Sequence, residues 1–490
     1  MRIALPRLAR PLVARPLVVL GLTATLLSGC GTLEPAYHRP ALPTPSAFPD
    51  AATSDTAASA AGVGWKTFFV DPRLRSVVEL ALANNRDLRV AVANIQAARA
   101  QYRIQRSDLF PKVNGSFGAA YGREPLSAAT GGTTTGTTGG VDHIDEHQYT
   151  ASLGVSAYEL DLFGRVRSLT KAALQTYLAS EEARRASQIS VISETANAWL
   201  TLAADRTVLK AAQDTLASSR ASLDIAQKRF ANGVASQLDV RQAETLVDQA
   251  RADVANDLTT VAQDRNALNL LTGSPVPDAL LPELSESQDA SGLVLADLPA
   301  GLPSDVLLAR PDVLQAEHTL RADNAQIGAA RAAFFPSISL TASGGATSPS
   351  LSSLFKGSSG TWSFTPQITL PIFDWGANRA NLAYTKAERD AALAQYEKAI
   401  QTAFSEVDNA LARRANVGEQ IAGQSAQVEA AADTLKLSQA RYDRGADTYL
   451  NVLVAQRTLY AARQALIAAR LTQWTNTVTL YAALGGGGAG

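Results

Sequence analysis

The stretch that decides the fold is Arg229-Phe230-Ala231-Asn232-Gly233, which recurs as Arg441-Tyr442-Asp443-Arg444-Gly445, 212 positions later (441 − 229 = 212). Each copy ends in glycine, the residue that most readily adopts the left-handed conformation that terminates a helix. The first copy lies between two runs without glycine or proline, 165–232 and 234–272. The sequence therefore predicts two helical hairpins, one reversing at Gly233 and the other at Gly445.

The helices that approach these turns are unusually long. Residues 165–232 make a run of 68 residues rich in Ala, Leu, Arg, Gln and Glu, which as a helix would be roughly 100 Å long. Such a length favours a coiled coil. In the second long helix we expect Gly418 and Gly423 to interrupt the helix as bends. Apolar residues recur every seventh position, the spacing of a supercoil, at Leu202, Leu209, Leu216, Leu223 and Phe230, and at Ile421, Val428, Leu435 and Tyr442.

The hairpins belong to an internal duplication of most of the chain. Asn85–Pro111 matches Arg310–Pro336 at an offset of 225, and Leu162–Gly164 matches Asp374–Gly376 at an offset of 212. The difference of 13 residues (225 − 212) falls in a Gly/Thr-rich loop around 127–140, as expected for a variable surface loop. The predicted segments are a first repeat at 65–273, a Pro-rich connector at 274–305, a second repeat at 306–484 and a flexible tail at 485–490.

Each repeat carries a predicted β-hairpin before its long helices. Ser337–Ser343 alternates polar and apolar residues, which is typical of a strand with two different faces. Strands of about ten residues can cross a bilayer when tilted. Four strands cannot close a transmembrane barrel, whose smallest forms have about eight, and unpaired edges are costly in lipid, so several chains must pool their strands. The predicted strands are about 112–123, 149–160, 337–346 and 361–370, and the helices follow at 165–272 and 377–484.

The N-terminal residues have the pattern that is typical of a targeting signal. Four arginines between Arg2 and Arg15 precede the apolar run Leu17–Leu27, which predicts a signal peptide at 1–29. Leu27-Ser28-Gly29-Cys30 resembles the bacterial lipobox, which implies cleavage before a diacylated Cys30 that anchors the protein in a membrane. Gly31 in place of aspartate implies sorting to the outer membrane. Residues 30–64, rich in Pro, Ala, Ser and Thr, are expected to form a loosely ordered, lipid-anchored tether.

Composition excludes several classes of function. The 490 residues include 44 Lys+Arg and 45 Asp+Glu, a balance without the polybasic face that nucleic-acid binding needs. One cysteine excludes a disulfide framework and a Cys-based zinc site. No Gly-x-Ser-x-Gly motif and no catalytic triad are recognisable, so we predict no enzyme and no cofactor. His143 and His147 have the spacing of a metal pair on a helix, but they lie in an expected loop, and we predict no metal site.

Together these features resemble the outer-membrane factor (TolC-like) family, most closely the lipoproteins of RND-type tripartite efflux systems. The resemblance implies a homotrimer with a 12-stranded outer-membrane β-barrel, continued by an α-helical barrel across the periplasm. It also implies partners, a periplasmic adaptor and an inner-membrane RND-type transporter, and a passive exit duct for small molecules such as drugs. Besides the lipobox, the resemblance is carried by Asn85–Leu88, Tyr158–Gly164, Leu370–Asp374 and Tyr449–Arg457.

The resemblance also implies functional positions near the two helix turns. The family's periplasmic gate falls on Asp239, Leu450, Asn451, Val454 and Arg457, with Leu450 as an apolar constriction and Arg457 in a charged network. Family members often have carboxylates where Asn451 and Val454 stand, so a complete acidic ring is not expected, although Asp447 adds a carboxylate. The helix tips implied to dock the adaptor carry Arg229, Phe230, Gly233, Arg441, Tyr442 and Gly445.

Three other readings compete with an efflux duct. A structural coiled-coil lipoprotein would not need two amphipathic hairpins of bilayer-crossing length. A general porin lacks long helices. A type I secretion duct for proteins shares the same architecture, and the sequence leaves the cargo open between small molecules and proteins.

Overall fold

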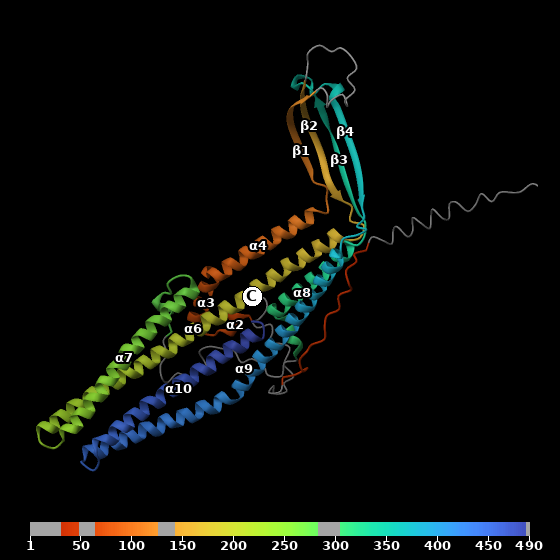
Figure 1. Ribbon diagram of the computed structural model, residues 1–490. Coiled ribbons are helices and arrows are strands. Elements are labelled where there is room, and N and C mark those ends of the chain that lie inside the picture. The colour runs from red at the N-terminus through yellow and green to blue at the C-terminus, as the bar shows by residue number, and fades with distance from the viewer. Residues whose placement is uncertain (1–30, 49–63, 126–142, 283–303, 487–490) are drawn as a thin grey trace, which may run out of the picture. The chain divides into compact units, whose positions relative to one another are not determined.

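The computed structural model describes residues 31–48, 64–125, 143–282 and 304–486 (Figure 1). The chain divides into two compact units, which we treat separately. The strand unit comprises the described residues of Met1–Arg39, Ala97–Tyr177 and His318–Leu393, and the helical unit comprises the described remainder. The signal peptide, Cys30, the loop around 127–140, most of the connector and residues 487–490 lie outside the described residues.

Helices predominate, and two of them are very long. Among the described residues, no helix is both long and apolar enough to span a membrane. The α-helices are α2 (Trp65–Phe68), α3 (Pro72–Asn84), α4 (Arg86–Ser107), α6 (Arg165–Ala231), α7 (Gln237–Thr272), α8 (Pro311–Ala332), α9 (Ala377–Asp443) and α10 (Tyr449–Ala483). Short 3₁₀ helices are η2 (Asp278–Leu280), η4 (Ser304–Ala309), η5 (Leu351–Ser353) and η6 (Gly357–Ser359).

The strand unit contains one antiparallel four-stranded sheet in the order β1-β2-β3-β4. Strand β2 begins at residue 143, six residues before the expected 149, because 143–148 continue the ladder with β1. His143 lies opposite Pro125 and His147 lies opposite Tyr121, so both histidines are in a strand and not in a loop. The strands are β1 (Val113–Pro125), β2 (His143–Glu159), β3 (Ser337–Ser348) and β4 (Gly360–Thr369).

Strands β2 and β3 join hairpins from different repeats. Their register places Tyr149 opposite Ser348 and shifts at a β-bulge between Val155 and Tyr158, where Ala157 has a φ of 53°. Strands β1 and β4 each have one neighbour in the sheet of the described chain. Both outer edges therefore present unpaired backbone groups.

The first described residues, 31–39, form an N-terminal segment that contacts both repeats. The Glu34 carboxylate accepts hydrogen bonds from Lys171 Nζ at 2.8 Å and from Asn324 Nδ2 at 3.2 Å. Gly328 leaves room for it, since a Cβ there would lie 2.9 Å from the backbone nitrogen of Glu34. These contacts differ from the loose ordering expected for 30–64, because Glu34 pairs with residues far along the chain that composition alone does not indicate.

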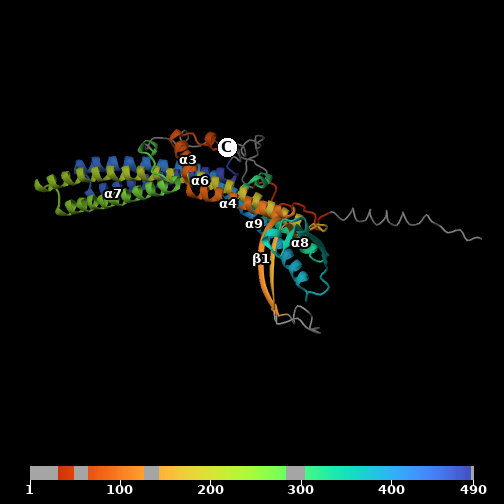
Figure 2. The ribbon, with the colours of Figure 1, turned by 90° about the horizontal axis from the view of Figure 1, so that it is seen from above.

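The helical unit is built from the hairpins α6–α7 and α9–α10, whose helices run side by side (Figures 1 and 2). Leu202 and Leu216 of the seven-residue repeat are buried. Helix α9 is continuous through Gly418 and Gly423, so neither glycine breaks the helix. Glycine inside a helix costs only about 1 kcal/mol relative to alanine, which packing along a long helix can offset.

The duplication extends to single contacts. Asn85 Nδ2 donates to the Leu271 carbonyl at 2.8 Å, at the end of α7. Its counterpart Arg310, 225 positions later, donates from Nη1 to the Ala483 carbonyl at 2.6 Å, and Ala483 is the counterpart of Leu271 (271 + 212 = 483). Equivalent positions therefore make equivalent contacts even where the side chain differs.

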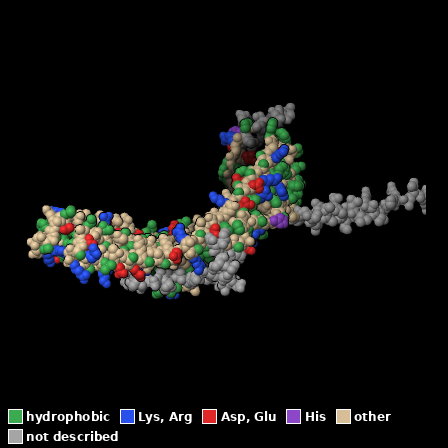
Figure 3. Space-filling model, turned by 90° about the horizontal axis from the view of Figure 1, so that it is seen from below, with side chains coloured by type: hydrophobic (Ala, Val, Ile, Leu, Met, Phe, Trp, Pro, Cys, Tyr) green, Lys and Arg blue, Asp and Glu red, His purple; other side chains and the backbone are tan. Residues whose placement is uncertain are grey.

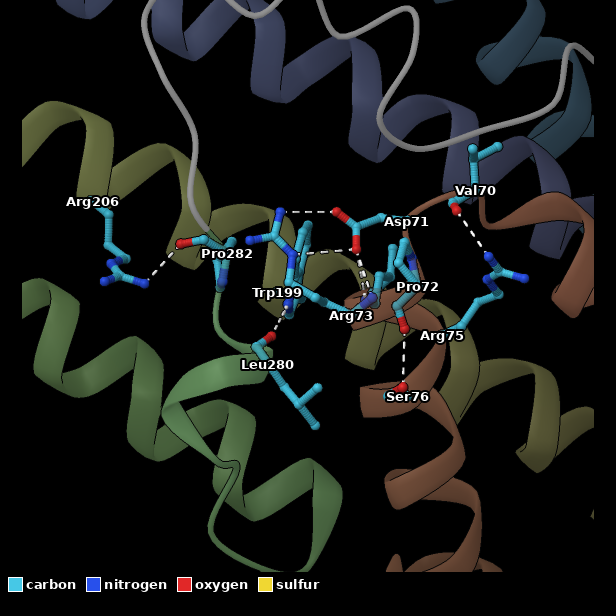
Figure 4. A network of polar contacts seen from close by, with 11 residues as sticks. Val70, Asp71, Pro72, Arg73, Arg75, Ser76, Trp199, Arg206, Leu280 and Pro282 are labelled. Carbon is cyan, nitrogen blue, oxygen red and sulfur yellow. Dashed lines mark hydrogen bonds and ion pairs between the residues drawn. The ribbon is translucent and has the colours of Figure 1, made fainter.

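Short helices and the start of the connector pack onto α6 and α10. Trp199 Nε1 donates to the Leu280 carbonyl at 3.0 Å, and Arg206 Nη1 donates to the Pro282 carbonyl at 2.7 Å (Figure 4). Asp71 caps α3 by accepting from the Arg73 amide at 2.7 Å. Such caps satisfy backbone donors that a helix leaves free at its start.

Candidate functional site

The sheet has one apolar and one polar face. The registers align Val113, Val155, Ala342 and Phe364 in one row across all four strands. On the other face, cross-strand serine pairs lie at 2.8 Å, Ser116 with Ser152 and Ser343 with Ser363. Hydrophobic side chains gather over the strands (Figure 3). The large exposed members of the apolar face are Val113, Phe117, Tyr121, Leu153, Trp362, Phe364 and Ile368.

A two-faced sheet of this kind suits a boundary between two media. Trp362 exposes 82% of its surface and Ile368 exposes 69%, which in water would be an unusual apolar patch. The opposite face offers hydroxyl groups that water can solvate. The arrangement can therefore form a wall with lipid on one side and water on the other.

The two helix turns share one backbone design. The Val234 amide donates to the Arg229 carbonyl and the Gly233 amide to the Phe230 carbonyl, both at 2.9 Å. The second turn repeats this pattern from Ala446 and Gly445 to Arg441 and Tyr442. Gly233 and Gly445 have φ values of 72° and 71°, so both glycines serve a left-handed helix end.

The tips of the two hairpins contact each other through Arg229 and Tyr442. The Arg229 guanidinium lies 4.4 Å from the centre of the Tyr442 ring, and its Nη1 donates to the Tyr442 carbonyl at 3.3 Å. Tyr442 is buried, packs on Tyr449 at 5.1 Å between ring centres, and burial raises its pKa. Among the predicted docking residues, Tyr442 thus faces inward, whereas Phe230 and Arg441 are exposed.

Asp239, the first of the predicted gate residues, acts as a helix cap. Asp239 Oδ2 accepts from the Ser236 amide at 2.9 Å, and the Asp239 amide donates to Ser236 Oγ at 3.2 Å. This reciprocal pair is a capping box at the start of α7. One carboxylate oxygen of Asp239 therefore caps the start of α7, in addition to any role in a gate.

The second turn differs, because its carboxylate precedes the helix. Asn451, the counterpart of Asp239 (239 + 212 = 451), donates from Nδ2 to Asp447 Oδ1 at 2.6 Å. Asp447 also accepts from the Thr448 amide at 2.8 Å and from Arg441 Nε at 3.1 Å. The Thr448 amide, then Asn451 and Arg441, lower the pKa of Asp447. A negative charge is thus kept at this turn, four residues before Asn451.

Three other predicted gate residues line one cavity. Leu450, Val454 and Arg457 border a space of about 770 Å³ between α7 and α10, together with Asp253 and Tyr460. Leu450 and Val454 are each more than half exposed. Burial, followed by the charges of Asp253 and Asp257, raises the pKa of Tyr460 to about 12. Arg457 is exposed and has no ion pair within the described part of the chain.

A pair of carboxyl groups that the sequence does not predict comes from Asp205 on α6 and Asp264 on α7. Burial, followed by a hydrogen bond with Asp264 and its charge, raises the pKa of Asp205 to about 6. Burial also raises the pKa of Asp257 nearby. A like charge close by disfavours the ionised form of a carboxyl group, here that of Asp205. Only the alignment of α6 with α7 brings them together, so no local motif announces the pair.

We expect Asp205→Asn to stabilise the protein at neutral pH. The pKa of Asp205 is about 6 when folded and 3.8 ordinarily, so between these values the folded state binds more protons, and stability falls as pH rises. Above about pH 6 the folded state carries the full free-energy cost of ionising Asp205, and the substitution by asparagine removes that cost. Thermal unfolding should show a higher midpoint for Asp205→Asn at pH 7.5 and a vanishing difference near pH 4. Asp248→Asn, at an exposed carboxylate on α7, is the control. An equal gain at both pH values for Asp205→Asn would contradict the raised pKa of Asp205.

Among the described residues, no group of three or more His, Cys, Asp and Glu side chains could hold a metal ion. His143 and His147 lie on β2, four residues apart. The His147 ring meets Tyr121 edge-on at 5.3 Å between ring centres. Asp145, between the histidines, accepts from Arg123 Nε at 2.7 Å.

The sequence pattern of outer membrane efflux proteins matches residues 77–274 and 302–486. The chain belongs to the outer membrane efflux protein family. This efflux protein is 48% identical over 472 residues to the probable efflux pump outer membrane protein TtgC of Pseudomonas putida, covering 96% of this chain and 95% of that one. It is 42% identical over 469 residues to the outer membrane protein OprJ of Pseudomonas aeruginosa, again covering 96% and 95%.

Solved structures agree with this assignment of the efflux protein. The open state of the MtrE outer membrane channel of Neisseria gonorrhoeae is 37% identical, with a TM-score of 0.82, and the match covers 94% of this chain and 99% of that one. CusC is 38% identical with the same TM-score, covering 93% and 100%. The predicted family, the mostly helical fold of two repeats with a small sheet, and the outer-membrane location are confirmed. The family is one of efflux channels and not of enzymes.

Proposed function

We propose that three copies of this efflux protein form an exit duct through the outer membrane. The two-faced sheet with two open edges carries the proposal. One chain offers four strands, too few to close a barrel, and its outer edges leave backbone groups that lipid cannot satisfy. Pooling strands from identical copies pairs the edges, turns the apolar face to lipid and turns the serine face to a wet lumen.

We further propose that the helical hairpins continue this duct into the periplasm and meet a tripartite system. The partners are a periplasmic adaptor, which docks at the tips around Phe230 and Arg441, and an inner-membrane RND-type transporter that supplies the energy. Conduction needs no chemistry by the duct itself, and no catalytic step is proposed. Acylation of Cys30 would anchor each copy to the membrane by its chains.

The names of two relatives indicate small molecules as the cargo. Two relatives from Pseudomonas putida, at 48% identity over 472 residues, are named an antibiotic efflux pump protein and a toluene efflux pump protein. We propose antibiotics and apolar organic compounds as the substrate class of this duct. A protein-secretion duct remains the alternative, and the same experiment separates the two.

Deletion of the gene tests the proposed cargo. The deletion strain should become more susceptible to several unrelated antibiotics and to toluene, and a plasmid copy of the chain should restore resistance. The proteins secreted into the medium should be unchanged. A strain with normal susceptibility that loses a secreted protein would overturn the small-molecule proposal in favour of the secretion duct.

We expect Arg457→Ala to open the duct. Arg457 is exposed on α10 beside Asp253 and has no ion pair within the described chain, so in the assembly its guanidinium is available to a neighbouring helix. Loss of that charge should raise single-channel conductance in planar bilayers several-fold. Arg444→Ala, in the exposed second turn, is the matched control. Unchanged conductance in Arg457→Ala would remove Arg457 from the gate.

A further inference from the structure

An aromatic pair joins the two repeats beneath the sheet. Phe163, between β2 and α6, stacks on Phe335, between α8 and β3, with ring centres 4.6 Å apart and ring planes 21° apart. Phe163 belongs to the first repeat and Phe335 to the second. Such stacked rings contribute more than their buried area alone. The pair therefore fastens the second strand of one repeat to the first strand of the next.

The duplication gives each of these two rings a counterpart in the other repeat, and the two counterparts do not stack on each other within the chain. The counterpart of Phe163 is Trp375 (163 + 212 = 375), and the counterpart of Phe335 is Phe110 (335 − 225 = 110). Trp375 exposes 90% of its surface and Phe110 exposes 63%. Phe110 precedes β1 and Trp375 follows β4, and these strands are the opposite edges of the sheet. The two rings cannot serve each other across the sheet of one chain.

We propose that Trp375 of one copy stacks on Phe110 of the next copy, which reproduces Phe163 on Phe335 across the subunit boundary. The inference rests on the proposed homotrimer and names one of its contacts. A head-to-tail contact of this kind uses two different surfaces and closes into a ring when the rotation permits. Repeat one contacts repeat two inside each chain, and repeat two contacts repeat one of the neighbour, all around the ring.

The backbone at Trp375 has an unusual conformation. Trp375 has a φ of 55°, which is uncommon for a bulky residue. Asp374 stabilises the turn, because its carboxylate accepts from the Gly376 and Asn378 amides, each at 2.9 Å. The next aromatic ring, Phe373, lies 5.1 Å from Trp375 and is itself 75% exposed.

A difference in burial between α4 and α8 supports the same partner. These helices are counterparts and precede Phe110 and Phe335. Helix α8 buries Ala325 completely and leaves Ala329 only 9% exposed. The corresponding residues of α4 are Ala100, which is exposed, and Ile104, which is 59% exposed. Helix α4 buries no residue. Part of this difference comes from the N-terminal segment, which packs on α8 at Asn324, and the exposed surface of α4 is open to a second copy.

Thiol cross-linking tests the pair in the full-length protein. Trp375→Cys and Phe110→Cys are combined in one chain, which is extracted in mild detergent and treated with a short bifunctional thiol reagent. The matched control combines Phe163→Cys with Phe335→Cys, which occupy the same positions within one copy. The wild-type chain, whose only cysteine is Cys30, controls for background. On non-reducing gels we expect dimers and trimers for the first pair and monomers for the control pair.

Each outcome bears on one of the two proposals. Absence of cross-linked oligomers for the first pair, while the control pair is cross-linked within the monomer, would overturn the Trp375–Phe110 contact. The native mass before treatment reports on the trimer separately. A trimeric mass without cross-links rejects only the contact, whereas a monomeric mass rejects the proposed assembly itself.

Single substitutions give an independent readout of the same contact. Trp375→Ala and Phe110→Ala should each weaken trimer association about tenfold or more, because three pairs are lost at once. In the double variant, trimer association should be weakened no more than in the single variant with the larger loss, since the two rings act together. Phe355→Ala, an aromatic residue 83% exposed between β3 and β4, should leave the trimer intact. Additive losses in the double variant would show that the rings do not meet.

Discussion

Gly345→Val is expected to prevent assembly in the outer membrane. A Cβ at residue 345 would lie 2.2 Å from the Ala151 carbonyl oxygen and 2.6 Å from Ser152 Cα. Both atoms belong to the backbone of β2, so no side-chain rotation can relieve the overlap. Because β2 and β3 are the only link between the two hairpins in the described sheet, the variant should yield no heat-resistant oligomer on gels of outer-membrane fractions.

The adjacent glycine supplies the control. A Cβ at Gly344 meets nothing within 4 Å, and Gly344 lies opposite Trp362 on the apolar face. Gly344→Val adds the same side chain to the same strand, one residue earlier, and should assemble normally. Equal amounts of oligomer from both variants would contradict the register between β2 and β3.

Gly328→Ala is expected to release the N-terminal segment. The added methyl group would lie 2.9 Å from the Glu34 nitrogen, 3.0 Å from Glu34 Cα and 2.6 Å from Ser168 Oγ. Overpacking of this kind costs about 1–3 kcal/mol, which the segment can avoid by leaving. Glu34 would then lose Lys171 and Asn324. We expect faster chymotrypsin cleavage after Tyr37, measured by mass spectrometry, and a lower midpoint of thermal unfolding.

Gly418→Ala is the matched control for this prediction. Gly418 also lies inside a helix, and a Cβ there meets nothing within 4 Å. Alanine should stabilise that helix by about 0.5–1 kcal/mol and leave cleavage at Tyr37 unchanged. If Gly328→Ala is also stabilised and resists chymotrypsin, Glu34 does not lie against Gly328 as described.

Local signals predicted much of the fold. Gly233 and Gly445 mark the helix ends because few other residues tolerate a left-handed cap, and the alternation in Ser337–Ser343 indicates a strand because its two faces differ. The start of β2 was missed, since Ile144 is the one aliphatic residue of 143–148 and pairing with β1 is what makes this stretch a strand. Glycine at 418 suggested an interruption, yet α9 is a continuous helix there.

Contacts between distant segments lay beyond sequence reasoning. The raised pKa of Asp205 depends on how α6 lies against α7, which no spacing in the sequence gives. Arg229 and Tyr442 were assigned to docking by resemblance, but their stacking on each other depends on how the two tips meet. The inward position of Tyr442 leaves Phe230 and Arg441 as the tip side chains open to a partner.

Glu34 accepts a hydrogen bond from Asn324, a residue that is synthesised and exported much later than Glu34. Export delivers residue 34 early, but its amide partner follows 290 positions later. Until then Glu34 has only Lys171 of the first repeat as a partner. Its arrival against α8 therefore signals that the second repeat has been translocated and folded, so an incomplete chain keeps a loose leading end that periplasmic proteases can find.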